Sequence, residues 1–268
     1  MLNFNKLWLK ARTYYHLKSL ILKGDKISPR AWEVDISHAI GMEHKGDNNN
    51  HADAVGGDIQ VSIKTVFLKP KILKKSARDF QSKPEKFIGP TYTKKHDYWI
   101  NGIELVQRRQ AITDGNGNTV NESTLSAKEI GELSIQGFKK THELSYAYYG
   151  TKKTYEVIVI NGYDCTGHNY LTSIFWDEYK FPDISTMEWK KTTGGVDGYQ
   201  QINGKYTKTM TRIDGNVPRH ATCFKEYKNL LSYENNIHYS VPIPELNEFN
   251  EEQIINEINT IENSRENK

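Results

Sequence analysis

The sequence predicts a mixed α/β fold (α+β in arrangement), with a central mixed sheet flanked by helices and a second half rich in strands. Two amphipathic helical segments stand near the start of the chain. A run of strictly alternating apolar and polar residues follows a glycine pair at 56–57. From residue 163 to 240, short Tyr-, Thr- and Asn-rich pieces are separated by glycine-containing turns.

Composition sets the class of protein. The 268 residues suffice for a sizeable core, and a net charge of +3 permits a nucleic-acid partner without requiring one. The two cysteines form no C-x-x-C pair, so we expect neither a zinc site nor a disulfide framework. Because we find no signal peptide and no run of 18 apolar residues, we expect a cytoplasmic protein with no membrane partner.

Two helices open the chain. Helical spacing of apolar residues predicts the first over 3–23. The second has Ser28 as N-cap, Pro29 in its first turn, a body from Arg30 to Ile40 and Gly41 as C-cap. Glu33 lies in its first turns, where either a role at a site or a simple exposed carboxylate favoured by the helix dipole explains it.

Residues 51–65 read as a β-hairpin around a Gly56-Gly57 turn. That turn would set Asp53 opposite Gln60, so that Asp53 shares a face with Ser62 and Lys64. The other face carries Ile59, Val61 and Ile63. A carboxylate, further oxygen groups and a lysine on one face suit Mg²⁺ and a water. A half-buried hairpin with a surface salt bridge is the alternative interpretation.

The hairpin resembles the active-site hairpin of the PD-(D/E)xK nuclease superfamily, which includes most type II restriction endonucleases. Asp53 matches the first acid of the family and Lys64 its lysine, while Ser62 stands where Asp or Glu is usual. The resemblance covers about 35 residues, from Ser28 to Thr65, together with the order of elements after them. It implies a restriction-endonuclease-like core.

The resemblance also implies a function. The chain would be a Mg²⁺-dependent type II restriction enzyme, a homodimer acting on double-stranded DNA. Asp53, Glu33 and Ile63 would hold the metal, and Asp53, Lys64, Ser62 and Glu33 would form the catalytic group. The alternatives are a repair or recombination nuclease on the same core and a non-catalytic DNA-binding protein.

Ser62 leaves the second acid to be found. Asp58 shares the strand face with Lys64, but six residues of strand span roughly 20 Å. A helix packed across the sheet can instead direct a side chain to its face. We therefore expect Glu33 rather than Asp58 to complete the metal site.

Basic and amide residues mark two candidate DNA contacts. Nine lysines and arginines lie between residues 69 and 95. The second half adds residue types that read base edges or phosphates, although any exposed sheet can carry them. The candidates are Lys69, Lys71, Lys74, Lys75, Arg78, Gln200, Gln201, Asn203, Arg212 and Arg219.

The remaining elements complete the expected order. Strand material around 98–112 precedes a long helix capped by Ser126, and the β-branched run 154–160 predicts a buried central strand. Further strands are expected at 170–176, 186–191, 198–203 and 205–213, and a final helix at 248–262. We assign residues 1–162 to a nuclease core and 163–268 to a β-rich DNA-recognition region with the last helix, together forming one compact domain.

Overall fold

The computed structural model describes residues 1–23, 27–45, 52–68, 112, 116, 118–163, 169–213, 219–220, 235–242 and 250–266. It confirms the predicted class, because helices accompany a mixed sheet and a separate antiparallel sheet. The basic segment from Lys69 to Lys95 and most of 98–112 lie outside the described residues. In the described part of the chain, every helix is too short or too polar to span a membrane.

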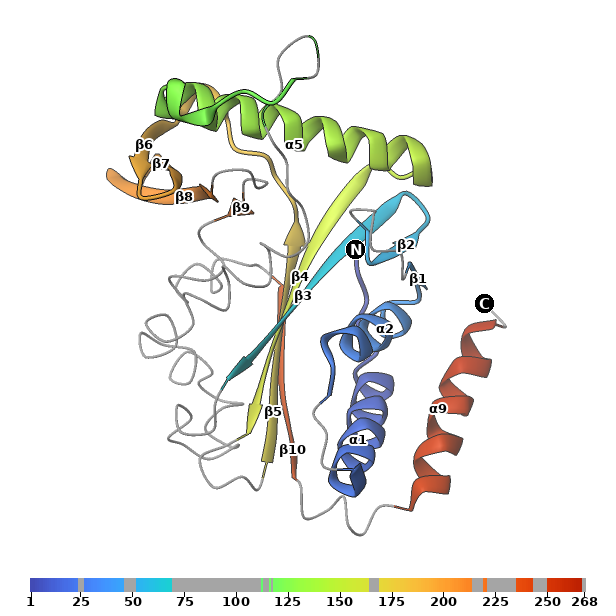
Figure 1. Cartoon of the computed structure of the whole chain (residues 1–268). Helices are drawn as coiled ribbons and strands as arrows, with labels where there is room; N and C mark the ends of the chain where they lie inside the picture. The colour runs from blue at the N-terminus through green and yellow to red at the C-terminus, as the bar shows by residue number, and fades with distance from the viewer. Residues whose placement is uncertain are drawn as a thin grey trace. The chain divides into compact units, whose positions relative to one another are not determined.

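The first sheet has six strands in the order β1-β2-β3-β4-β5-β10 (Figure 1). β3 and β4 run parallel, and the other described pairings in this sheet are antiparallel. The strands are β1 (Glu43–His44), β2 (Ala54–Gly56), β3 (Ile59–Leu68), β4 (Lys153–Tyr163), β5 (Asn169–Glu178) and β10 (Asn235–Pro242).

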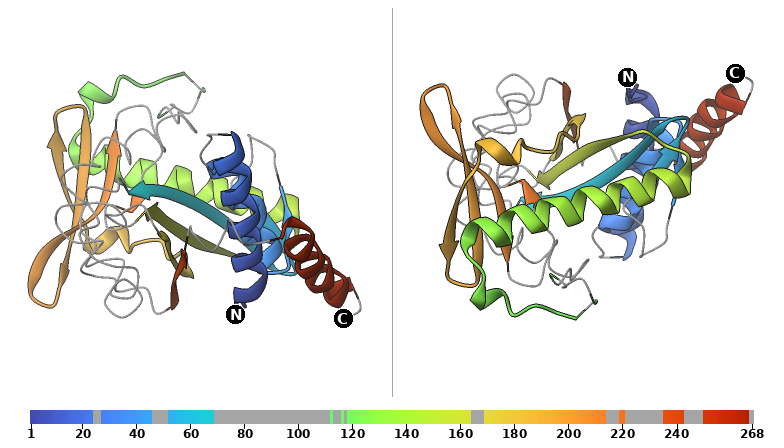
Figure 2. Two further views of the ribbon diagram at one scale, coloured as in Figure 1. Left: turned by 90° about the horizontal axis from the view of Figure 1, so that it is seen from below. Right: turned by 90° about the horizontal axis from the view of Figure 1, so that it is seen from above.

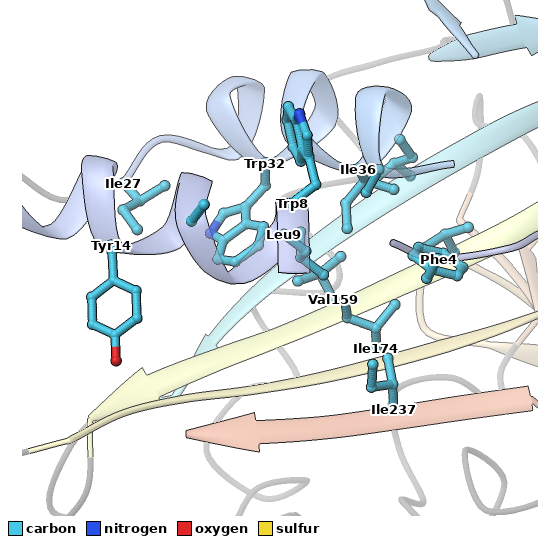
Figure 3. Close-up of a cluster of buried hydrophobic side chains, with 14 of the residues drawn as sticks. Phe4, Trp8, Leu9, Tyr14, Ile27, Trp32, Ile36, Val159, Ile174 and Ile237 are labelled. Atoms are coloured by element: carbon cyan, nitrogen blue, oxygen red, sulfur yellow. The ribbon is translucent and has the colours of Figure 1, made fainter. Parts of the chain in front are cut away.

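Three helices cover one face of this sheet: α1 (Lys6–Lys23), α2 (Pro29–Ala39) and α9 (Glu251–Glu266). Both further views place them on the same side (Figure 2). Their apolar residues share one core with Val61 and Ile63 of β3 and with Val157 and Val159 of β4. Figure 3 shows Trp32 of α2 among the labelled residues of this core.

The ends of α2 follow the prediction. The Ser28 hydroxyl accepts a hydrogen bond from the Ala31 N–H at 3.1 Å, and Gly41 has a φ of +72°, which favours glycine. The buried carboxylate of Asp35 in α2 accepts a hydrogen bond from Arg12 Nε of α1 at 2.8 Å. It also lies 2.7 Å from Nδ1 of His16 in α1, so polar contacts join the two helices. These contacts fix the position of α2, the helix that carries Glu33.

A second unit has its own sheet, in the order β6-β7-β8-β9, and its own apolar core. Ser126 and Glu129 form a reciprocal cap at the start of α5, with hydrogen bonds of 3.2 and 2.7 Å. Gly131 of α5 lies so close to Trp189 that an added Cβ would be 2.1 Å from its ring. The elements are η3 (Glu122–Thr124), α5 (Ala127–Tyr149), η4 (Ile184–Thr186), β6 (Glu188–Thr192), β7 (Gly195–Ile202), β8 (Lys205–Ile213) and β9 (Arg219–His220).

The division into units differs from the boundary expected after residue 162. One unit contains Met1–Ile88, Tyr149–Glu178 and Tyr233–Lys268, and the other contains Gly89–Tyr148 and Tyr179–Ser232. β5 and β10 extend the sheet of the first unit instead of joining the later strands. Local strand patterns do not reveal which sheet a strand joins, so the division by contacts and the division expected from the sequence fall at different residues.

Candidate active site

The hairpin turns one residue later than predicted. Gly56 pairs with Ile59, so Gly57 and Asp58 form the turn, and Gly57 has a φ of +58°. Val55 therefore pairs with Gln60, a shift of two residues from the expected register. The pairing of β2 with β3 ends at Ala54, so Asp53 lies one residue beyond the ladder.

Asp53 stands where β2 separates from β3. Its N–H donates to the Val61 carbonyl at 2.8 Å, one step beyond the Ala54–Val61 pair but out of the register of the ladder. Beyond that step, the Asp53 carboxylate takes the place of a backbone acceptor of β2, because its Oδ2 accepts the N–H of Ile63 at 2.6 Å. The alternation of backbone groups along β3 directs the Ile63 carbonyl to the same side.

Lys64 brings a cation to these oxygens. Its Nζ donates to the Ile63 carbonyl at 3.3 Å and lies 3.7 Å from Asp53 Oδ2. We call Asp53, Ile63 and Lys64 the notch. The Asp53 and Lys64 side chains are 25% and 17% exposed, so a ligand can reach charges that are already partly removed from water.

Glu33 is electrostatically coupled to the notch. Burial and the negative charge of Asp53 raise the pKa of the Glu33 carboxyl to about 7, against opposing effects of Lys64 and Arg30. Its Oε2 lies 4.0 Å from Nε2 of His44. Asp58 instead lies exposed in the hairpin turn, where its carbonyl accepts the N–H groups of Lys152 and Lys153.

His44 was missed by sequence reasoning. Residues 42–50 were read as a polar loop, but Glu43 and His44 form β1 and pair with Val55 and Ala54. A strand of two residues carries too little alternation to be seen in a sequence. Its position beside Glu33 makes His44 a neighbour of the site.

The polar face of β3 is less solvated than expected. Gln60 is fully buried and donates to Thr154 Oγ1 at 2.9 Å, while its own oxygen accepts the hydroxyl hydrogen of Thr151 at 3.3 Å. These contacts fix β3 against β4. Ser62, two residues on, is half-buried between this network and Lys64.

The candidate DNA contacts of the second half separate into different groups. Gln201 and Asn203 are exposed at the β7–β8 turn, where Asn203 has a φ of +50°, whereas Gln200 donates to Thr186 at 3.1 Å. Arg219 lies in β9, and its side chain is outside the described residues, as are Lys69, Lys71, Lys74, Lys75 and Arg78.

Arg212 does not fit its predicted role. Its side chain is only 1% exposed, and Nη2 donates to Glu122 Oε1 at 2.6 Å, while Nη1 donates to Oε2. Both ends of the fork are therefore used inside the second unit. Arg212 holds η3 to β8 and presents no surface to a phosphate.

The donors of the notch suit Mg²⁺. In the described part of the chain, no three His, Cys, Asp or Glu side chains are grouped to hold a metal ion. Mg²⁺ commonly binds through one or two carboxylates together with substrate phosphate and water. The Asp53 carboxylate and the Ile63 carbonyl are hard oxygen donors of this kind, and each has an oxygen within 3.7 Å of the ammonium group of Lys64.

Comparison of the chain with protein-family models, with curated proteins and with solved structures returned no match. The interpretation of the notch therefore rests on its residues and geometry.

Proposed function

We propose that this chain is a Mg²⁺-dependent endonuclease that hydrolyses phosphodiester bonds in double-stranded DNA at a specific site, in the manner of type II restriction enzymes. The notch is the observation that supports it. Where two strands separate, a lysine ammonium lies 3.7 Å from a carboxylate oxygen and 3.3 Å from a main-chain carbonyl oxygen.

Each group has a role in this reaction. Asp53 and Ile63 would hold the metal, which supplies positive charge at the phosphate when bound. Lys64 donates a hydrogen bond that orients the attacking water or a phosphate oxygen. The water oxygen bonds to phosphorus in line with the leaving oxygen and loses one proton to solvent. The bond between phosphorus and the leaving oxygen breaks, and the leaving oxygen takes up a proton from solvent.

The DNA partner and the assembly belong to the same proposal. Gln201 and Asn203 present amide groups at an exposed strand turn, and amides pair with adenine edges in the major groove. A homodimer is proposed because a two-fold symmetric enzyme matches a two-fold symmetric DNA site.

The decisive experiment incubates the purified protein with plasmid DNA and Mg²⁺. Discrete fragments support site-specific cleavage. Smeared or structure-dependent products indicate a repair or recombination nuclease on the same core. Binding without any cleavage indicates a DNA-binding protein and refutes the proposal.

Asp53→Asn is the matching variant. It should abolish cleavage and leave DNA binding equal or tighter, because a carboxylate facing phosphate is repulsive until a cation neutralises it. Asp58→Asn, which changes an exposed carboxylate in the same hairpin, should cleave at the wild-type rate. Cleavage by Asp53→Asn at the wild-type rate would remove the notch from the reaction.

A further inference from the structure

The β7–β8 hairpin extends beyond its sheet as a two-stranded ribbon. In the described part of the chain, β6 accompanies β7 as far as Tyr199, and β9 accompanies β8 at two residues near its other end. β7 and β8 continue to pair past these points, as far as Ile202 and Lys205. We call Gln201–Tyr206 the ribbon tip. All six of its residues are exposed.

The ribbon tip is fixed at its turn and at its base. Asn203 and Gly204 have φ values of +50° and +75°, as in the two-residue Asn-Gly turns that match the twist of a hairpin. At the base, the Gln200 side chain donates to Thr186 Oγ1 at 3.1 Å, which joins β7 to η4. Binding of a ligand by the tip therefore requires little ordering of the backbone.

The dimensions of the ribbon tip fit the major groove of B-DNA. Its two strands lie about 4.8 Å apart, and three residues at about 3.4 Å each extend about 10 Å beyond Gln200. The major groove is about 12 Å wide and about 8.5 Å deep and admits a two-stranded β-ribbon, whereas the minor groove is about 6 Å wide. The ribbon tip can therefore reach base edges in the major groove.

The charge of this segment also suits DNA. The sequence from residue 198 to residue 213 contains no Asp or Glu, so no carboxylate in it would be repelled by phosphate. Near the base of the ribbon, Lys208 Nζ lies 2.6 Å from Asp197 Oδ2. Lys205 is exposed in the ribbon tip, where it can contact a phosphate at the rim of the groove.

We propose that the ribbon tip enters the major groove of double-stranded DNA and determines which sequence is bound. The proposal rests on the DNA partner of the proposed function and assigns the element that recognises it. The amides of Gln201 and Asn203 would pair with N6 and N7 of adenine. Ile202, which is 45% exposed, would contact a thymine methyl group, and Lys205 would position the tip on the backbone. The target therefore contains A·T base pairs.

The test compares ordinary plasmid fragments with fragments amplified with 7-deaza-dATP in place of dATP. The modified fragments lack the N7 acceptor of adenine in the major groove and keep their backbone and base pairing. Gel-shift assays without divalent cations measure the affinity for each, and cleavage with Mg²⁺ is measured separately. The wild type should bind the modified fragments about tenfold or more weakly, because bidentate contacts with adenine are lost.

Gln201→Ala combined with Asn203→Gly should abolish this difference between the fragments. Glycine retains the positive φ of position 203 while removing the amide. The matched control is Gln200→Ala, which removes the neighbouring amide that donates to Thr186 and should discriminate between the fragments like the wild type.

A separate variant tests the phosphate contact. Lys205→Ala should reduce the steepness of log affinity against log salt concentration by about 0.9, the value for one phosphate contact. Lys128→Ala, on the exposed surface of α5, should leave this slope unchanged. An unchanged slope in Lys205→Ala would remove this lysine from the interface.

Equal affinity of the wild type for ordinary and modified fragments would overturn the proposal, as would a preference for ordinary DNA that persists in the double variant. The endonuclease proposal fails differently. A protein that prefers ordinary DNA through the ribbon tip and cleaves none of it with Mg²⁺ keeps the ribbon assignment and is not an endonuclease. Cleavage of both kinds of fragment at equal rates supports the endonuclease and overturns the ribbon assignment.

Discussion

Two ion pairs of the same chemical kind differ in length and exposure in this chain. In the second unit, Arg212 and Glu122 are 1% and 12% exposed and are joined through the two terminal guanidinium nitrogens, Nη1 and Nη2, the latter at 2.6 Å. In the first unit, Lys64 and Asp53 lie 3.7 Å apart and are 17% and 25% exposed.

The difference in length and exposure decides whether the oxygens of a charged pair are accessible to a ligand. A bidentate pair satisfies two donors and both acceptor oxygens in one rigid geometry, so a ligand gains nothing by approaching it. A longer pair beside open backbone groups keeps its oxygens within reach of another cation. We therefore expect the Arg212–Glu122 pair to contribute to stability and the Lys64–Asp53 pair to contribute to reactivity.

Arg212→Ala should have the largest effect on stability. It leaves the Glu122 carboxylate buried without its partner, which costs on the order of 3 to 5 kcal/mol of unfolding free energy. Urea denaturation measures this loss. Lys64→Ala, measured in the same way, should lose about 1 kcal/mol or less, as partly exposed pairs do. Equal losses of unfolding free energy in the two variants would contradict the expected difference between the two ion pairs.

Lys64→Ala should instead slow cleavage by on the order of a hundredfold, the range attributed to a well-placed electrostatic group. Single-turnover cleavage of plasmid DNA gives the rate. The control is Lys128→Ala on the surface of α5, where the side chain is 73% exposed and only faces Glu132 at 3.9 Å. If Lys64→Ala loses folding and not rate, the structural interpretation of the hairpin face is favoured.

Glu33→Gln should alter the pH dependence of stability. The native state retains on Glu33 a proton that the unfolded chain has released between pH 4.5 and about 7, so this carboxyl lowers the wild-type unfolding free energy as pH rises through that interval. The charged groups around it are Asp53, Lys64, Arg30 and His44.

Glutamine cannot ionise, so its advantage over the wild type should grow across the same interval to about 1 to 3 kcal/mol and then remain constant. Denaturation at pH 4, 6 and 8 measures the difference. Asp58→Asn should show no such growth. A parallel pH dependence of Glu33→Gln and wild type would mean that the Glu33 carboxyl is not coupled to the notch.

Ser28→Ala should have the smallest effect. Removing the N-cap of α2 costs about 1 kcal/mol, and Ser126→Ala at the cap of α5 should cost a similar amount. Thermal melting compares the two. Cleavage at a saturating Mg²⁺ concentration should stay within about twofold in Ser28→Ala, because α1 contacts still position α2.

Local patterns sufficed for much of the fold. The cap at Ser28, the reciprocal cap at Ser126, the alternation of Ile59, Val61 and Ile63, and the buried run of β4 all lie within a few residues of the signals that predicted them. The turn was misplaced by one residue, because Gly56 pairs with Ile59 and the register of β2 with β3 changes by two.

Features that depend on distant residues were not predictable in the same way. Glu122 meets Arg212 from 90 positions away, and no local pattern distinguishes a buried arginine from one that contacts phosphate. The proximity of Glu156 to Ser62 depends on the parallel register of β3 and β4, which the sequence does not display. A search for acids should therefore include the strand beside the hairpin as well as the preceding helix.

The parallel pairing of β3 with β4 also has a kinetic consequence. It joins residues 59–68 to residues 153–163, and much of the second unit is encoded between them. The entropy cost of closing so long a loop arises before the strand contacts can stabilise the chain. Folding rates therefore fall as the sequence separation of contacts grows. The hairpin with Asp53 and Lys64 can form early from neighbouring residues, whereas the pairing of Ser62 with Glu156 must wait for β4. During synthesis, the nascent chain would thus hold its candidate site without the neighbouring strand of the sheet until residues 153–163 have emerged and docked.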